Sequence, residues 1–330
     1  MTRRILLDTD IGTDADDAVA LALALASPEL ELAGIVVTGK CAALRARIAA
    51  KLCVLAGRAD IPVHVGATEP ARPGSFYWVG HEGDGIVTAT ETLALAGSDG
   101  VAAYDTIAHD VGVDVVVIGT LTTLAAALDR YPDLAERIPR LVVMGGHVRA
   151  GRYGGAALPF GLDYNLCADG TAAARVLASG IPTWLVPIEV TWQAWLGRAD
   201  LARLATGGPL QQAIAAGLRG WAPVQAAVAT GIGCASLDNV DFLHDPLTVA
   251  CAHDDSFCTW EEIPIRVARV NGVFRTLEFA GATPMRVAVS VDADRIHNHV
   301  MERIMKSDSG DGALALPIHQ HSDEPAGARG

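Results

Sequence analysis

Residues 5–18 constrain the fold of this chain more than any other stretch. Three apolar residues, Ile5 to Leu7, indicate a buried strand. Five aspartates follow within ten positions, and Gly12 among them allows the chain to turn tightly. These aspartates are Asp8, Asp10, Asp14, Asp16 and Asp17. A run rich in alanine and leucine, residues 18–26, then predicts a helix whose first turn holds the last two.

Carboxylates this close together raise one another's pKa unless a cation joins them. The partial positive charge at one helix start cannot neutralise all five. The sequence therefore predicts a metal site with oxygen ligands, which favours Ca²⁺ or Mg²⁺. The alternative is a solvated acidic loop with helix caps. We favour the metal because a buried strand carries the aspartates to the ligand-binding edge of a sheet.

Composition limits the kinds of partner that the chain can bind. Its 330 residues, 51% hydrophobic and 19% charged, can bury a large core within one α/β domain. The formal net charge of −13 argues against a nucleic-acid partner and favours a neutral or cationic ligand. We expect no membrane partner, because the apolar runs are shorter than the roughly 20 residues that a spanning helix needs.

The cysteines favour a reducing compartment. None of the six belongs to a CxxC pair, and most lie in apolar runs, so we expect buried free thiols. The N-terminus leads directly into the first strand with no secretory signal. We therefore predict a cytoplasmic location.

Strand and helix patterns alternate along the rest of the chain. Buried strands are predicted at 32–38, 62–65, 113–119, 140–146, 183–187 and 287–291. Helices are predicted at 42–56, 99–110, 122–130, 169–179, 198–233 and 292–306. This alternation predicts an α/β fold, with a mostly parallel, Rossmann-like sheet flanked by helices in a single domain over 1–306.

Other segments are predicted to be hairpin, loop or tail. Residues 263–270 and 273–279 form a β-hairpin by the Asn271-Gly272 turn rule. Residues 66–88, with Tyr77, Trp78, His81 and Asp84, form a long loop of the kind that often carries function, and 158–165 form another loop. Residues 307–330 are predicted to be a disordered tail.

Polar residues follow several of the predicted strands. Because ligands bind outside the carboxyl ends of parallel strands, these groups are expected to meet at one edge. They are the aspartate cluster, Thr38-Gly39-Lys40, Gly119-Thr-Leu-Thr-Thr123, Met144-Gly-Gly-His147, Asp163-Tyr-Asn165 and His244-Asp245. Such carboxylates, hydroxyls, an amide and a histidine suit a metal and a polyhydroxylated ligand.

In these motifs the sequence resembles the Ca²⁺-dependent nucleoside N-ribohydrolases of the inosine–uridine-preferring type, over residues 4 to about 305. Asp8-Thr-Asp-Ile-Gly-Thr-Asp-Ala-Asp-Asp17 resembles the DxDxGxDD signature of that family, with two extra residues before the final pair. Met144-Gly-Gly146 and His244-Asp-Pro-Leu247 match its MGG and HDPL motifs. Residues 119–123, 163–165 and 189–191 are similar to GPLTN, EFN and DVT.

The resemblance implies hydrolysis of the N-glycosidic bond of a ribonucleoside in nucleoside salvage by a homodimer or homotetramer. It implies four Ca²⁺ ligands: Asp10, Asp17, Asp245 and the main-chain carbonyl of Thr122. Asp10 would also be the general base, and His244 would lie near the leaving base. The substrate would further contact Asp16, Asp163, Asn165, Met144 and His81. Asp8 would orient the ligands from behind, and Asp14 falls in the two-residue insertion.

The chemistry is consistent with these roles. Cleavage through an oxocarbenium-like state needs an activated water, nearby negative charge and help for the departing group. We expect Trp192, Trp195 and Trp221 to pack in the core rather than to stack on a base.

Two departures from the family pattern concern the substrate. Lys40 stands where the family has an asparagine, and residues 151–155, Gly-Arg-Tyr-Gly-Gly, contain no asparagine for the ribose 5′-hydroxyl. We predict that the ammonium group of Lys40 reaches the aspartate cluster, or recognises an acidic group on the substrate. The alternative is a lysine whose charge lies in solvent.

Two other functions stay open at this point. Asp8-Thr-Asp10 resembles the nucleophile strand of haloacid-dehalogenase-like phosphohydrolases, although Gly12 stands where those enzymes usually have Thr or Val. A non-catalytic protein that binds ribose or a metal is the second alternative.

Overall fold

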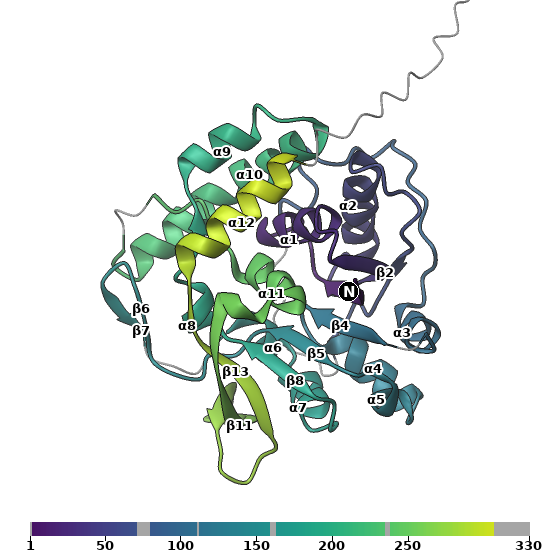
Figure 1. Ribbon diagram of the computed structural model, residues 1–330, viewed down its shortest axis with the longest axis vertical. Helices are drawn as coiled ribbons and strands as arrows, with labels where there is room; N and C mark the ends of the chain where they lie inside the picture. The colour runs from purple at the N-terminus through teal and green to yellow at the C-terminus, as the bar shows by residue number, and fades with distance from the viewer. Residues whose placement is uncertain (1, 71–79, 111, 159–162, 235–237, 307–330) are drawn as a thin grey trace, which may run out of the picture.

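The apolar run near the N-terminus forms β1 (Arg3–Thr9), in the interior of a nine-stranded sheet. The computed structural model describes residues 2–70, 80–110, 112–158, 163–234 and 238–306 (Figure 1). Strand β1 pairs in parallel with β2 (Leu30–Val37) on one side and β4 (Val113–Val117) on the other. The chain runs from β1 through β2 to β3 (Val63–Val65) and then returns to β4, so the strand order reverses beside β1. In open α/β sheets, ligands bind at such a reversal.

The predicted α/β fold with a mostly parallel sheet is confirmed. The strand order is β12-β11-β13-β8-β5-β4-β1-β2-β3, and pairing is parallel from β13 to β3. The strands not yet given are β5 (Leu141–Met144), β8 (Thr183–Val186), β11 (Cys258–Val270), β12 (Val273–Glu278) and β13 (Pro284–Val291). Strands β11 and β12 form the predicted hairpin, with φ of 51° at Asn271 and 86° at Gly272. The positive φ values are what a two-residue Asn-Gly turn requires.

Helices cover both faces of the sheet (Figure 1). In β1, Ile5 and Leu7 belong to one buried apolar cluster and Leu6 to the other, as the alternation of a strand requires. The first cluster includes residues of α1 (Asp16–Leu25), α2 (Ala42–Leu55), α10 (Pro209–Gly231), α11 (His244–His253) and α12 (Ala293–Lys306). The second includes residues of α3 (Gly100–Ala108), α4 (Thr122–Arg130), α5 (Leu134–Arg137) and α7 (Gly170–Leu177).

Short elements account for most differences from the sequence prediction. Asn165 lies in α6 (Tyr164–Ala168) and not in a loop, and the helix predicted over 198–233 is divided into α9 (Arg198–Leu204) and α10. The short unpredicted elements include α5, β6 (Gly151–Tyr153), β7 (Ala156–Leu158), α8 (Ile188–Thr191), β9 (Trp195–Leu196) and β10 (Asp241–Phe242). Helix α11 was missed because its start carries polar site residues. Elements of two to five residues are too short for hydrophobic periodicity to reveal.

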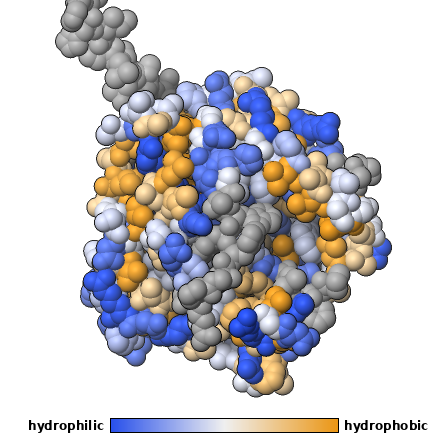
Figure 2. Space-filling model, turned by 180° about the vertical axis from the view of Figure 1, so that it is seen from behind, coloured by the Kyte–Doolittle hydropathy of each residue, from blue (hydrophilic) through white to orange (hydrophobic). Residues whose placement is uncertain are grey.

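Hydrophobic and hydrophilic residues are interspersed over the face that Figure 2 shows. None of the helices in the described ranges is long and apolar enough to cross a membrane. The predicted tail, 307–330, and Tyr77 and Trp78 of the predicted loop lie outside the described residues. The domain boundary at residue 306 stays a prediction.

Candidate active site

The loop between β1 and α1 presents the aspartates at the carboxyl end of β1. Asp16 and Asp17 form the first turn of α1, as predicted, and both are buried. The hydroxyl group of Thr9, the last residue of β1, donates a hydrogen bond to Oδ1 of Asp17 and accepts one from the amide of Ile11 at 3.1 Å. The end of the strand therefore fixes the start of the helix.

A second segment adds a carboxylate to this loop. Asp245 lies in the first turn of α11, which packs against α1, and its amide donates to Oδ2 of Asp16 at 3.2 Å. One carboxylate oxygen from each of Asp16, Asp17 and Asp245 lies within 4.8 Å of the others. We call these three residues the metal group, because the arrangement could hold a metal ion.

The metal group lines a cavity of about 480 Å³. Seven of the residues predicted from the sequence contribute to its lining: Asp10, Asp16, Asp17, Met144, Asn165, His244 and Asp245. Asp10 follows the last residue of β1 and lies beside Gly119, which comes two residues after β4. A Cβ at Gly119 would lie 2.9 Å from Oδ1 of Asp10, so only glycine leaves room for this carboxylate.

Burial makes these carboxylates costly to ionise without a cation. It raises the pKa of Asp16, Asp17 and Asp245 well above the usual value, and the charges of neighbouring aspartates raise each further. It also raises the pKa of Asp10, while the charge of Arg45 opposes that rise. Buried, clustered carboxylate oxygens are the donors that a hard divalent cation requires, so the residues fit such an ion.

Arg45 is the cation beside the aspartates, and the sequence analysis missed it. The Arg45 side chain, 4% exposed, extends from α2 and donates to the main-chain oxygen of Asp10. It also donates to Thr13 Oγ1 at 2.8 Å and to Glu82 Oε1 at 3.1 Å. Arg45 therefore joins the aspartate loop to residue 82, in the segment that was predicted to cover the site.

Lys40 does not occupy this position. Its side chain is exposed, and only its main-chain oxygen contacts Arg45, at 2.8 Å from Nε. The following residue, Cys41, has a φ of 62° and is the N-cap of α2. The prediction that Lys40 faces the aspartates is not supported by this geometry, because the chain turns there before the helix begins.

Three other predicted residues also lie outside the cavity lining. Asp163 caps α6 by accepting from the amide of Leu166 at 2.8 Å, and Thr122 donates from its hydroxyl to Asp169 at 2.9 Å. His81 has an exposed side chain and lies beside a small neighbouring pocket with Thr13 and Asp14. The predicted contacts of these three residues with substrate or metal therefore stay predictions.

Asp8 lies near the end of β1, just before the loop, and its role in orienting the ligands stays a prediction. Its two carboxylate oxygens accept from the hydroxyls of Thr38 and Tyr104, both at 2.6 Å. Burial raises the pKa of Asp8 to about 7. These hydrogen bonds connect the ends of β1 and β2 with α3.

Asn165 and His244 have defined partners at the cavity wall. The amide nitrogen of Asn165 donates to the main-chain oxygens of Ile118 and Met144, at 2.8 and 3.2 Å. His244 is within hydrogen-bond distance of the hydroxyl of Thr191 through Nδ1, and its burial lowers its pKa to about 3. The imidazole is therefore neutral near pH 7.

Aromatic side chains complete the lining, and one of them, Trp221, also packs in the buried core as predicted. Trp192 and Trp221 both line the cavity, whereas Trp195 does not. His147 packs edge-on against Trp192, with ring centroids 5.0 Å apart. Their positions far apart in the sequence gave no signal that these rings would face the same space.

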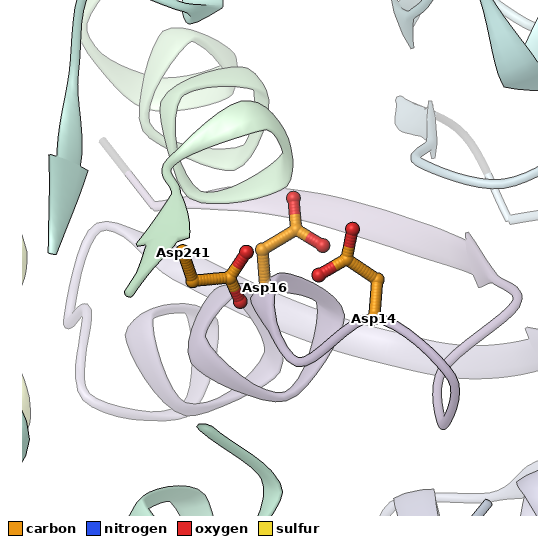
Figure 3. A group of neighbouring side chains, drawn as sticks. All are labelled: Asp14, Asp16 and Asp241. Carbon is orange, nitrogen blue, oxygen red and sulfur yellow. The ribbon is translucent and has the colours of Figure 1, made fainter. Parts of the chain in front are cut away.

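The inserted residue Asp14 belongs to a second group of carboxylates. Asp14, Asp16 and Asp241 each place a carboxylate oxygen within 4.8 Å of the others (Figure 3). Asp241 was not singled out from the sequence. Its only signal there is a position three residues before the His244-Asp245 motif.

Comparisons with known proteins point to one family. The sequence profile described as "Inosine-uridine preferring nucleoside hydrolase" matches residues 5–298. The chain belongs to this family. The resemblance inferred from the motifs is thereby confirmed, and the chain is an N-glycosyl hydrolase of ribonucleosides.

Individual relatives agree. The chain is 31% identical over 259 residues to the pyrimidine-specific ribonucleoside hydrolase RihA of Enterobacter sp. (strain 638), covering 76% of this chain and 79% of that protein. Among solved structures, the purine-preferring ribonucleoside hydrolase from Gardnerella vaginalis superposes with a TM-score of 0.80 at 26% identity, covering 93% and 99% of the two chains. A plant nucleoside hydrolase gives 0.75 at 25% identity, with 92% and 99% coverage. The phosphohydrolase and non-catalytic alternatives gain no support from these relatives.

Proposed function

We propose that this nucleoside hydrolase uses Ca²⁺ and cleaves ribonucleosides to ribose and free base in the cavity of about 480 Å³. The observation that carries the proposal is the metal group, three buried carboxylates from α1 and α11 that converge at the cavity wall. All the donors are oxygen atoms, which favours Ca²⁺ over a softer metal.

Asp10, Asp17, Asp245 and the main-chain carbonyl of Thr122 would hold the ion. When bound, Ca²⁺ supplies the positive charge that fixes the ribose hydroxyls and a water molecule in place and favours deprotonation of that water. Asp16 would accept a hydrogen bond from a ribose hydroxyl, and Asn165 and Asp163 would support the sugar.

The reaction requires a proton acceptor close to the attacking water. Asp10 takes that proton as the water oxygen bonds to the anomeric carbon, and the bond to the base nitrogen breaks with its electron pair on the base. The neighbouring carboxylates stabilise the positive charge that develops on the sugar ring. His244, Met144 and the ring of Trp192 contact the departing base. His81, in the predicted loop over residues 66–88, would also contact the substrate.

A nucleoside panel tests this proposal. Purified protein with Ca²⁺ is expected to release free ribose from at least one purine or pyrimidine ribonucleoside, and the chelator-treated protein is expected to be inactive until Ca²⁺ returns. The relatives named above include pyrimidine-specific and purine-preferring enzymes, so both classes belong in the panel. No ribose release from any nucleoside by Ca²⁺-loaded protein would contradict the proposal.

Two further properties belong to it. We propose a homodimer or homotetramer, which sedimentation equilibrium of the purified chain tests directly. We also propose a reducing, cytoplasmic location, which the six free cysteines support.

A further inference from the structure

Asp241 is a buried carboxylate without a well-formed hydrogen bond. It lies in β10, its residue is 1% exposed, and neither Oδ atom has a partner at ordinary hydrogen-bond geometry within the described part of the chain, although the Phe242 amide and the Asp14 carboxylate act on it. The carboxylate points toward Asp16 and Asp14 at the start of α1 (Figure 3). Burying an ionised carboxylate without a good donor or a cation costs free energy comparable to the whole stability of many domains. Something must therefore neutralise Asp241.

No protein cation performs this role in the described structure. No lysine or arginine of the described residues forms an ion pair with Asp14, Asp16 or Asp241. Arg45 instead contacts the main-chain oxygen of Asp10 and the carboxylate of Glu82. The remaining choices are a proton shared between Asp14 and Asp241, or a bound cation.

We propose that Asp14, Asp16 and Asp241 bind a second divalent cation, separate from the one at the metal group. One oxygen of each lies within 4.8 Å of the others, a spacing that a cation with oxygen ligands can bridge. Asp16 belongs to both groups, but the proposed function assigns the first ion to Asp10, Asp17 and Asp245, so a carboxylate oxygen of Asp16 can serve the second ion. Asp14 is half-buried and lines the cavity, which gives the ion an entry path.

The second cation would hold the short strand β10 in place. Strand β10 is only two residues long and pairs with β9, so few hydrogen bonds hold it. An ion shared by Asp241 and the start of α1 fixes β10 against that helix. Because α11 begins directly after β10, the ion also positions His244 and Asp245 at the cavity.

Calcium titration of metal-free protein, followed by calorimetry, counts the sites. The wild-type chain is expected to bind two Ca²⁺ ions, and Asp241→Asn, which keeps the shape but not the charge, is expected to bind one. Asp245→Asn, which damages the metal group, is also expected to bind one. Asp238→Asn is the matched control, because its side chain is 64% exposed on the same segment, and it is expected to keep both.

The melting temperature, which can be measured without any enzymatic activity, tests this inference separately from the proposed function. Ca²⁺ is expected to raise the melting temperature of Asp245→Asn, since the second site still binds in the folded state only. Should Asp241→Asn not fold, Asp14→Asn, at a half-buried position, serves instead and is expected to lose the same ion.

The outcomes are distinct. One ion in the wild type, lost in Asp245→Asn but kept in Asp241→Asn, overturns this inference, leaves the proposed function intact and assigns a shared proton to Asp14 and Asp241. One ion lost only in Asp241→Asn supports the second site and contradicts the proposed Ca²⁺ site. No bound ion overturns both.

Discussion

Replacing Arg45 with methionine tests whether one buried cation holds the aspartate loop and the segment around Glu82 together. The paired side chains of Arg45 and Glu82 are only 4% and 9% exposed. Removing one partner of a buried ion pair leaves the other charge uncompensated and destabilises a protein by about 3–5 kcal/mol. Glu82 keeps donors from the amide of Gly80 and the hydroxyl of Thr13, both at 2.9 Å. We therefore expect the lower end, about 3 kcal/mol.

The assay is urea denaturation of the metal-free protein at neutral pH, with an exposed pair as control. Arg130 contacts Asp99 at 2.9 Å, but the two side chains are 53% and 54% exposed. Arg130→Met is expected to cost less than about 1 kcal/mol, as surface pairs do. If Arg45→Met loses no more stability than this control, the ion pair does not hold the segment.

The same substitution is expected to change calcium affinity and stability in opposite directions. The charge of Arg45 opposes the rise in the pKa of Asp10 and Asp17, and it also repels a divalent ion at those carboxylates. Arg45→Met is therefore expected to bind Ca²⁺ more tightly although the fold is less stable. Weaker binding in a folded variant would refute the electrostatic part of the reasoning.

Three other substitutions test the proposed roles. Asp10→Asn is expected to lower kcat by roughly 10²-fold or more while the fold and bound metal persist, as loss of a general base does. Near-normal turnover would exclude Asp10 as the general base. His244→Ala is expected to lower turnover of purine nucleosides and of para-nitrophenyl riboside by similar factors, because the neutral imidazole has no proton on Nε2 to give the leaving base; a far larger loss on purine nucleosides would show that His244 acts as an acid. Lys40→Asn is expected to change neither Ca²⁺ affinity nor substrate preference, because its side chain is exposed; a change in either would restore its predicted role.

The parts of the site that lie close together in the sequence could be predicted. Strand β1, the turn at Gly12 and the aspartates of α1 form one continuous segment, so local patterns determine their arrangement. The topology then explains why Asp245 joins them, because α11 packs against α1. The family motifs, not periodicity, identified Asp245 in advance.

Contacts between distant segments could not be predicted in the same way. Arg45 and Lys40 are both cations near the end of β2, and the sequence does not say which one faces inward. The turn at Cys41 decides it, with the Arg45 side chain directed at the loop and Lys40 at solvent. Asp241 likewise reaches Asp14 only because β10 ends beside α1, more than 200 residues later in the chain.

The protonation of His244 follows from one hydroxyl group. Thr191 Oγ1 donates its only proton to the main-chain oxygen of Ile188 at 3.1 Å, so it must accept from Nδ1 of His244. Nε2 then carries a lone pair, and the imidazole contributes a hydrogen bond and no charge.

Burial lowers the pKa of His244 to about 3, below its value of about 6.5 in the unfolded chain. The unfolded state therefore binds the extra proton between these values, so this histidine makes stability fall as the pH drops from about 6.5 toward 3. His297 affects the pH dependence of stability in the opposite direction, because its hydrogen bond to Asp200 raises its pKa. The stability that His297 contributes is lost as the pH rises through that raised value. Nitrogen NMR of the two imidazoles is expected to show His244 neutral with a proton on Nδ1 from pH 5 to 8, and His297 titrating above its usual range. A titration of His244 near pH 6.5, or a proton on Nε2, would mean that it can act as an acid toward the base.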